Sequence, residues 1–286
     1  MSQLIFERYE EIKLALKSQV DNVLISNMFA DLYKICFNFL KDCPKIDLES
    51  QIPGKTYFAF SKGSKFTRPI NKMLFTTDPS KQIRFFDKAN ENNITDIGPD
   101  EITKACYNIA ICFCAAIDIL KEGDQKTPGT FFEYLMGHLF TLNIGVSPRN
   151  QVDVLNMDMR SKLPTDFIFD LGQNMPKFHV PVKTSTRERV IQVWAHQRVL
   201  DGVYGTGRFI CLLTCLGETK LDHKTKQVTE ICLPDQWRLY QMFIAQIKRV
   251  YYLDVPVKYY ELNNFFPKIH VKQFGDFFHE REILLE

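Results

Sequence analysis

Hydrophobic positions recur at helical spacing at the start of the chain. Residues 3–18 and 21–42 carry apolar side chains three and four positions apart, which predicts two helices with one buried face each. Residues 44–93 are less regular and contain three candidate short strands, "KTYFAF", "KMLFTT" and "QIRFF". A helix over about 100–121 is apolar nearly all round, so we expect it in a core. Gly123 ends it, and another helix is expected over about 129–142.

The second half alternates strands and helices. Two strands over 165–171 and 178–184 are separated by a short turn, which predicts a β-hairpin. We expect a helix over 187–200, a buried strand over 208–216, a short strand over 228–233, a helix over 235–249 and a strand over 250–255. This order predicts an α/β fold in which helices flank a mixed β-sheet, with a mainly helical N-terminal part packed on it.

Composition and charge limit the class of protein. The net charge of +2 excludes a histone-like polycation but allows local basic surfaces. The eight cysteines form no CxxC pair and most lie in apolar runs, so reduced buried thiols are expected rather than disulfides or zinc ligands. The first residues lack the features of a secretory signal, and no apolar run reaches the roughly 18 residues of a membrane span. We therefore expect an intracellular protein.

Acidic and basic side chains gather at one end of the predicted hairpin. Asp166 begins its first strand and Lys183 closes its second, so the two can meet. A carboxylate binds Mg²⁺, and a nearby ammonium group can orient a water or offset charge on a phosphate. Asp170 lies on the same face as Asp166 and is the second choice. Glu133, among aromatic neighbours on the preceding helix, can supply a further carboxylate.

These residues resemble the active site of the PD-(D/E)xK nuclease superfamily. Pro164-Thr165-Asp166 matches its "PD", with one residue interposed, and Lys183 matches its final lysine. The following "KTSTRER" and its amphipathic helix resemble one branch of type II restriction endonucleases. That branch reads sites built on CCGG, or on CC and GG split by a central base pair. The resemblance covers about residues 128–217, and its specific part is 181–201.

The resemblance implies a restriction-endonuclease-like core and Mg²⁺-dependent cleavage of palindromic double-stranded DNA. It implies that Arg187, Glu188 and Arg189 read bases, because guanine offers two acceptors to an arginine fork and cytosine offers an amine to a carboxylate. Each good bidentate pair contributes about 1–3 kcal/mol of discrimination. A homodimer or a tetramer, part of a restriction-modification system in a prokaryotic cytoplasm and without a membrane partner, follows from the same resemblance.

The sequence departs from the superfamily pattern at Pro181, where the middle acid is expected. In the CCGG branch a glutamate about 13–14 residues after the lysine often replaces this acid. Here those positions hold His196 and Gln197. Gln197 can coordinate Mg²⁺ through its amide oxygen, and Asp201, one turn further on, is a fallback. The expected catalytic set is therefore Glu133, Asp166, Lys183 and Gln197, with Asp166 and Glu133 as metal ligands.

This interpretation divides the chain into an N-terminal mainly helical region, 1–95, and a catalytic nuclease domain, 96–286. Residues 1–95 are expected to contact flanking DNA or to form a dimer interface.

Other interpretations stay open. The cluster at 187–189 can be a solvated helix start, and Asp166 can be a cap residue after Pro164. A nuclease of the same fold with structure or repair specificity is one alternative function. A catalytically silent DNA-binding protein is another, supported by Pro181 and the neutral residues at 196 and 197. The chain has no GxxxxGK[ST] loop and no zinc-like histidine spacing.

Overall fold

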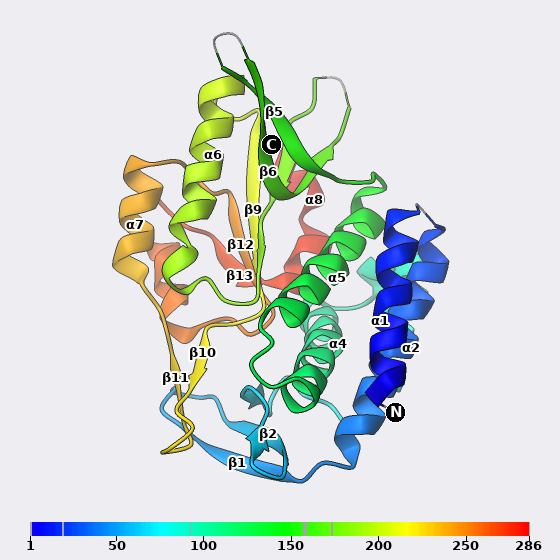
Figure 1. The fold of residues 1–286 in the computed structure, drawn as a ribbon. Coiled ribbons are helices and arrows are strands. Elements are labelled where there is room, and N and C mark those ends of the chain that lie inside the picture. Colours follow the sequence, from blue (N-terminus) through cyan, green and yellow to red (C-terminus); the bar gives the residue numbers. More distant parts are fainter. Residues whose placement is uncertain (1, 19, 92, 157–158, 173, 286) are drawn as a thin grey trace. The chain divides into compact units, whose positions relative to one another are not determined.

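The computed structural model describes residues 2–18, 20–91, 93–156, 159–172 and 174–285 (Figure 1). The chain forms two compact units. The first comprises residues 1–143 and 219–231, and the second comprises 144–218 and 232–286. The boundary expected at residue 95 falls within the first unit, and the roles expected for residues 1–95 and 96–286 stay predictions.

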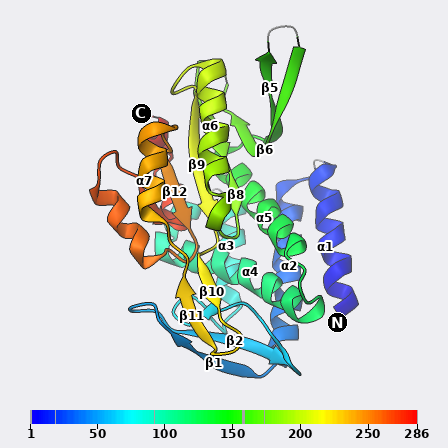
Figure 2. The same ribbon diagram turned by 60° about the vertical axis from the view of Figure 1, so that its left-hand side comes forward.

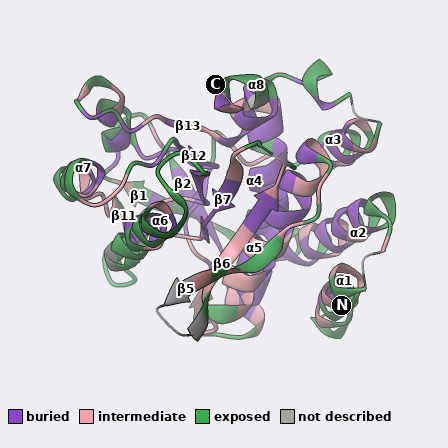
Figure 3. Ribbon diagram, turned by 90° about the horizontal axis from the view of Figure 1, so that it is seen from above, coloured by how far each residue is buried: buried purple, intermediate pink, exposed green. Residues whose placement is uncertain are grey.

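The first unit contains five helices among its described residues: α1 (Ser2–Lys17), α2 (Asn22–Lys41), α3 (Ser80–Asn90), α4 (Pro99–Leu120) and α5 (Lys126–Ile144), together with the short 3-10 helix η1 (Ile94–Asp96). The α1 and α2 helices run side by side (Figure 2). Pro99 occupies the first turn of α4, where its missing N–H costs nothing. As expected, α4 is a core helix, coloured as buried along most of its length in Figure 3.

Two of these helices, α2 and α4, are long and apolar enough to cross a membrane by length and composition alone. The expectation that no apolar run is long enough for a membrane span is therefore wrong for α2 and α4. In α4, 89% of the apolar window is buried inside the molecule, and a soluble core helix passes the same test.

The strands of the first unit form a sheet in the order β10-β11-β1-β2-β3, with β4 on β2. They are β1 (Lys45–Ser50), β2 (Tyr57–Lys62), β3 (Lys65–Phe66), β4 (Ile70–Asn71), β10 (Thr219–Leu221) and β11 (Gln227–Glu230). Two predicted strands are wrong. "QIRFF" lies in α3, where Gln82, Phe85, Phe86 and Ala89 are buried at helical spacing, and "KMLFTT" is a turn and an irregular segment.

The second unit contains the predicted mixed sheet. Its strands are β5 (Arg149–Asn156), β6 (Met159–Asp170), β7 (Lys177–Val180), β8 (Val182–Lys183), β9 (Phe209–Cys215), β12 (Arg249–Tyr252) and β13 (Val271–Gln273). The order is β13-β12-β9-β7-β6-β5, with β8 on β9. The β6–β7 pair is antiparallel, which confirms the hairpin, while β7, β9, β12 and β13 run parallel. The sequence missed β5 and the first half of β6.

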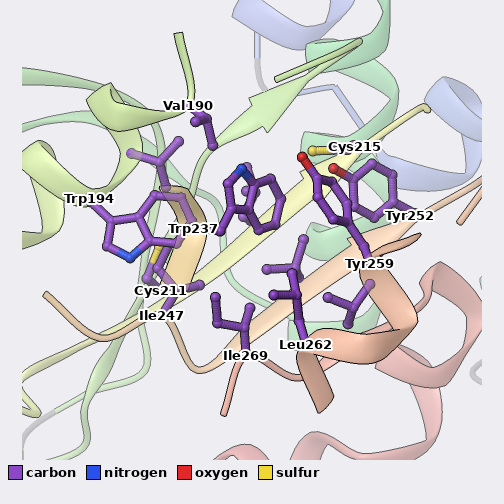
Figure 4. Packing of buried hydrophobic residues seen from close by; sticks show 14 of the residues in the cluster. Val190, Trp194, Cys211, Cys215, Trp237, Ile247, Tyr252, Tyr259, Leu262 and Ile269 are labelled. Atoms are coloured by element: carbon purple, nitrogen blue, oxygen red, sulfur yellow. The ribbon is translucent and has the colours of Figure 1, made fainter. Parts of the chain in front are cut away.

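The second unit also contains α6 (Ile191–Tyr204), α7 (Pro234–Phe243), α8 (Arg281–Leu285) and the 3-10 helices η2 (Arg187–Arg189), η3 (Val257–Asn264) and η4 (Phe274–His279). Trp194 of α6 and Trp237 of α7 meet edge to face, with ring centroids 5.4 Å apart (Figure 4). The helix expected over 235–249 ends at Phe243, because Arg249 already begins β12. This aromatic packing holds α6 against the sheet, where it forms one wall of the candidate site.

All eight cysteines are reduced, seven of them buried and Cys232 partly exposed. The prediction of thiols without disulfides is confirmed.

Candidate active site

Asp166 and Lys183 meet as the hairpin predicts. The Lys183 ammonium donates to Asp166 Oδ2 at 2.7 Å, and the backbone N–H of Val182 donates to the same oxygen at 2.8 Å. Within the described part of the chain, Asp166 Oδ1 accepts no hydrogen bond. The carboxylate is therefore anchored through one oxygen and presents the other.

Pro181 interrupts the strand that carries Lys183. Because proline has no N–H to give to a ladder, β7 ends at Val180 and β8 begins at Val182. The Pro181 carbonyl still accepts from Thr214 N at 2.9 Å, and β8 continues beside β9. The chain thus keeps Lys183 on the sheet although the residue two positions earlier is not an acid.

A cavity of about 140 Å³ opens beside the Asp166–Lys183 pair. One wall comes from the hairpin and the other from the first turns of α6. One polar atom of its lining, Thr165 Oγ1, is buried without a hydrogen-bond partner. The lining residues are Pro164, Thr165, Asp166, His179, Pro181, Lys183, Gln192, Val193 and His196.

Gln197 lies beside this cavity but does not line it. Its Nε2 donates to Phe209 O and to Asp201 Oδ1, each at 2.9 Å, and its Oε1 is 3.0 Å from His179 Nδ1. The amide oxygen expected to coordinate Mg²⁺ is therefore taken by His179. The residue that reaches the cavity from this turn of α6 is His196.

His179 is a cavity residue that the sequence analysis missed. Because both amide hydrogens of Gln197 are donated elsewhere, its oxygen must accept, so Nδ1 of His179 carries the ring proton. Burial lowers the pKa of His179 to about 4, and burial also lowers the pKa of His196. Both imidazoles are thus neutral near pH 7. The available signal was strand alternation, since residues 179, 181 and 183 share one face.

The two fallback acids have other partners. Asp170 Oδ2 accepts from the Lys177 ammonium at 2.6 Å, and this hydrogen bond lowers the pKa of Asp170. Asp201 accepts from Gln197, and burial raises the pKa of Asp201. Neither carboxylate lines the Asp166 cavity.

Glu133 lies on α5 in the first unit and is half-buried. Asp166 and Lys183 belong to the second unit. The expected role of Glu133 as a metal ligand stays a prediction.

Residues 187–189 form the short helix η2, directly before α6. Arg187 and Arg189 are exposed, and neither makes an ion pair or a side-chain hydrogen bond within the described part of the chain. Arg187 has φ of +35°, an uncommon backbone conformation for a residue with a side chain. The side chain of Glu188 lies outside the described residues. The side chains of Arg187 and Arg189 are therefore accessible to solvent.

Comparison with known proteins assigns the fold. The chain has the fold of a type II restriction endonuclease, a mixed α/β architecture. The crystal structure of the type IIP restriction endonuclease Kpn2I matches with a TM-score of 0.83 and 24% sequence identity, over 100% of this chain and 98% of that one. A second structure, a complex of the restriction endonuclease PspGI with substrate DNA, matches with a TM-score of 0.41 and 13% identity, over 72% and 80% of the chains. No family model and no curated protein matches the sequence.

Proposed function

We propose that the protein is a Mg²⁺-dependent, sequence-specific double-stranded DNA endonuclease of type II. Its expected target is a palindromic site containing CCGG, or CC and GG split by a central base pair. One observation carries the proposal: the Asp166–Lys183 pair faces a cavity, and two exposed arginines follow within six residues. A fold that matches a restriction endonuclease along its whole length supports it.

The donor atoms at the cavity fit Mg²⁺. Asp166 Oδ1 is available, and Thr165 Oγ1 is a buried oxygen without a partner. Among the described residues, no three His, Cys, Asp or Glu side chains are grouped as metal ligands. Mg²⁺ usually binds through one or two carboxylates and completes its shell with water and phosphate oxygens. Asp166 would hold the ion. When bound, Mg²⁺ supplies an activated water and offsets phosphate charge.

Lys183 acts on the phosphodiester group. Its ammonium has three N–H donors, of which Asp166 uses one, so the others can donate to a water or to phosphate oxygens. The Asp166 carboxylate fixes where the ammonium lies before DNA arrives. A preorganised donor of this kind stabilises the charge that develops as water attacks the phosphorus.

Basic side chains also gather at a second, wider hollow of the same unit. Its volume is about 760 Å³, and Arg149, Lys177 and Arg208 line it together with Asp170. Cationic surface groups bind DNA phosphates and release counterions, so they raise affinity without reading sequence. We assign this hollow to contacts with the DNA backbone.

A palindromic site calls for a symmetric protein. Each protomer of a homodimer, or of a tetramer, would present one Asp166–Lys183 cavity to one strand. Such an enzyme acts in the prokaryotic cytoplasm within a restriction-modification system. Analytical ultracentrifugation should give at least twice the mass of the 33.4 kDa chain, and a monomer at all concentrations would contradict the assembly.

The first experiment removes the metal ligand. We expect Asp166→Ala to reduce Mg²⁺-dependent cleavage below detection, because the carboxylate both holds the ion and anchors Lys183, while DNA binding by gel shift survives. Asp235→Ala is the control, since this exposed carboxylate of the second unit pairs with Arg238 on the same helix and lines neither hollow. An Asp166→Ala protein that cuts at the normal rate would remove the assignment.

The second experiment tests base reading. Glu188→Ala should weaken discrimination at the cytosine positions, because no carboxylate is left to accept from the cytosine amine. Cleavage of duplexes that carry single substitutions at each position measures this. An unchanged site preference in the variant would exclude Glu188 as a reader.

A catalytically silent DNA-binding protein is the second candidate. The absence of an acid at Pro181 and the engagement of Gln197 by His179 favour it, since they leave one carboxylate in the cavity lining. Binding of DNA without Mg²⁺-dependent cutting would select this candidate. Cutting that leaves ends without a common sequence would instead select a structure-specific or repair nuclease.

A further inference from the structure

A buried carboxylate lies behind the base-reading segment. Glu218 follows β9 and is 1% exposed. Its Oε1 accepts from Thr186 N at 2.8 Å, from Thr186 Oγ1 at 2.6 Å and from the Tyr252 hydroxyl at 2.8 Å. Its Oε2 accepts from Ser185 Oγ at 2.8 Å. Two of its three partners, Ser185 and Thr186, directly precede Arg187.

Glu218 does not belong to the catalytic cavity, whose lining excludes it. Burial raises the pKa of Glu218, but four donors converge on the carboxylate. Removing a buried charged group from water is costly unless it is fully hydrogen-bonded. The carboxylate of Glu218 therefore serves to hold the groups of Ser185, Thr186 and Tyr252 that donate to it.

The backbone on either side of this contact is also fixed. Leu216 N donates to Lys183 O at 3.1 Å, and Gly217 N donates to Thr184 O at 3.3 Å. Arg189 N donates to Thr186 O at 3.0 Å and closes η2. Thr186 thus gives its N–H and hydroxyl to Glu218 and its carbonyl to η2. The segment after β9 binds every residue from Lys183 to Thr186 through backbone or side-chain atoms.

The conformation that follows needs such support. Arg187 has φ of +35°, which is disfavoured for residues with a β-carbon, and such conformations persist only where the surroundings enforce them. The Thr186 side chain, which precedes η2, makes no capping bond to that helix because Glu218 takes its hydroxyl. Rigid support for Thr186 is therefore what sets the direction in which Arg187 and Arg189 leave the strand end.

We propose that Glu218 is a positioning residue for base recognition, which fixes the 185–186 turn and so holds the arginines of η2 in one geometry relative to Lys183. The inference rests on the proposed function. It adds a specificity-determining group that touches neither DNA nor metal. The ligand that it serves is the edge of G and C bases in the major groove.

The chain offers a matched control. Glu280 is also a buried carboxylate of the second unit, 4% exposed, and it accepts from Arg249, Tyr251 and Lys272. None of these partners belongs to the 183–189 segment. Glu218→Gln and Glu280→Gln each replace a buried carboxylate by an amide, so both variants should lose stability. Only Glu218→Gln should release the 185–186 turn.

The first readout needs no DNA. Trypsin cuts after arginine, and cutting of a folded protein follows the population of the locally open form. Loss of a charged hydrogen bond should raise cutting after Arg187 and Arg189 about ten- to a hundredfold in Glu218→Gln. In Glu280→Gln, trypsin should cut after Arg187 and Arg189 at the wild-type rate. Thr186→Val, which removes only the hydroxyl, should show a smaller increase, and Thr186→Ser should restore the wild-type rate.

The second readout uses DNA. We expect the ratio of affinities for the cognate duplex and a single-mismatch duplex to fall about tenfold in Glu218→Gln. The cleavage rate at saturating cognate DNA should change little, because Asp166 and Lys183 are untouched. If Glu218→Gln has the same affinity ratio and the same trypsin rate as Glu280→Gln, the role of Glu218 is overturned while the proposed function stands. A wild-type protein without preference for any duplex would overturn the proposed function and the inference with it.

Discussion

At the scale of single residues, the orientation of two neighbours on α6 decides what the cavity contains. Spacing from Lys183 points to His196 and Gln197 equally, because a helix presents adjacent residues about 100° apart and a count uncertain by one residue cannot choose between them. In the structure His196 lines the cavity, while Gln197 is buried and bonded to His179, Asp201 and Phe209. The helix rotation, set by Trp194 packing on Trp237, is what the sequence does not show.

Glutamate substitutions at these two positions should lower stability to different extents. Gln197→Glu removes both donors and places a carboxylate against Phe209 O and Asp201, so the free energy of unfolding should fall by about 1–3 kcal/mol. His196→Glu, at a half-buried position in the cavity lining, should cost less. Urea denaturation of both variants measures this, and equal losses would contradict the buried network around Gln197.

At the scale of elements, a long hydrophobic pattern was sufficient to predict a helix or a strand, and a short or weak pattern was not. The α4 helix and the hairpin strands were predicted because each has a long apolar pattern and clear turn residues. The α3 segment reads as a strand in "QIRFF", since five residues are too few to distinguish two periods. Strand β5 was missed because it is identified by its pairing with β6 more than by its own hydrophobic pattern. Asp166 and Lys183 were predicted because a hairpin is local, whereas Glu218 meets residues 32 positions away.

The contact between α6 and α7 should dominate the stability of the second unit. Trp237 is fully buried against Trp194 and Tyr259. Trp237→Ala should lower the free energy of unfolding by about 3–5 kcal/mol, because a large cavity replaces the indole. Phe243→Ala on the same helix, where the ring is 74% exposed, should change it by about 0.5 kcal/mol or less. Similar losses in both variants would exclude this packing as the support of α6.

At the scale of the whole molecule, buried neutral histidines should make stability depend on pH. Burial lowers the pKa of His138 to about 3, whereas an unfolded histidine titrates near its ordinary value of 6.5. Between these values the unfolded chain binds a proton that the folded chain does not. The free energy of unfolding is therefore highest above pH 6.5 and falls as the pH drops, by up to about 1.4 kcal/mol per pH unit for this group.

His138→Gln provides the check, because glutamine does not titrate. Its unfolding free energy, measured by urea denaturation between pH 7 and 5, should decline less steeply than that of the wild type. An identical slope in the two proteins would show that His138 is not held neutral by the fold.

The proposed activity also involves the whole molecule, because it needs the Asp166–Lys183 cavity, the arginines of η2 and a symmetric assembly. The most direct measurement is to incubate the purified protein with unmethylated phage DNA and Mg²⁺ and to sequence the ends of the fragments. We predict a single set of ends at a palindrome containing CCGG, or CC and GG around a central base pair, and no fragments without the metal. Intact DNA, or ends without a common sequence, would contradict the account.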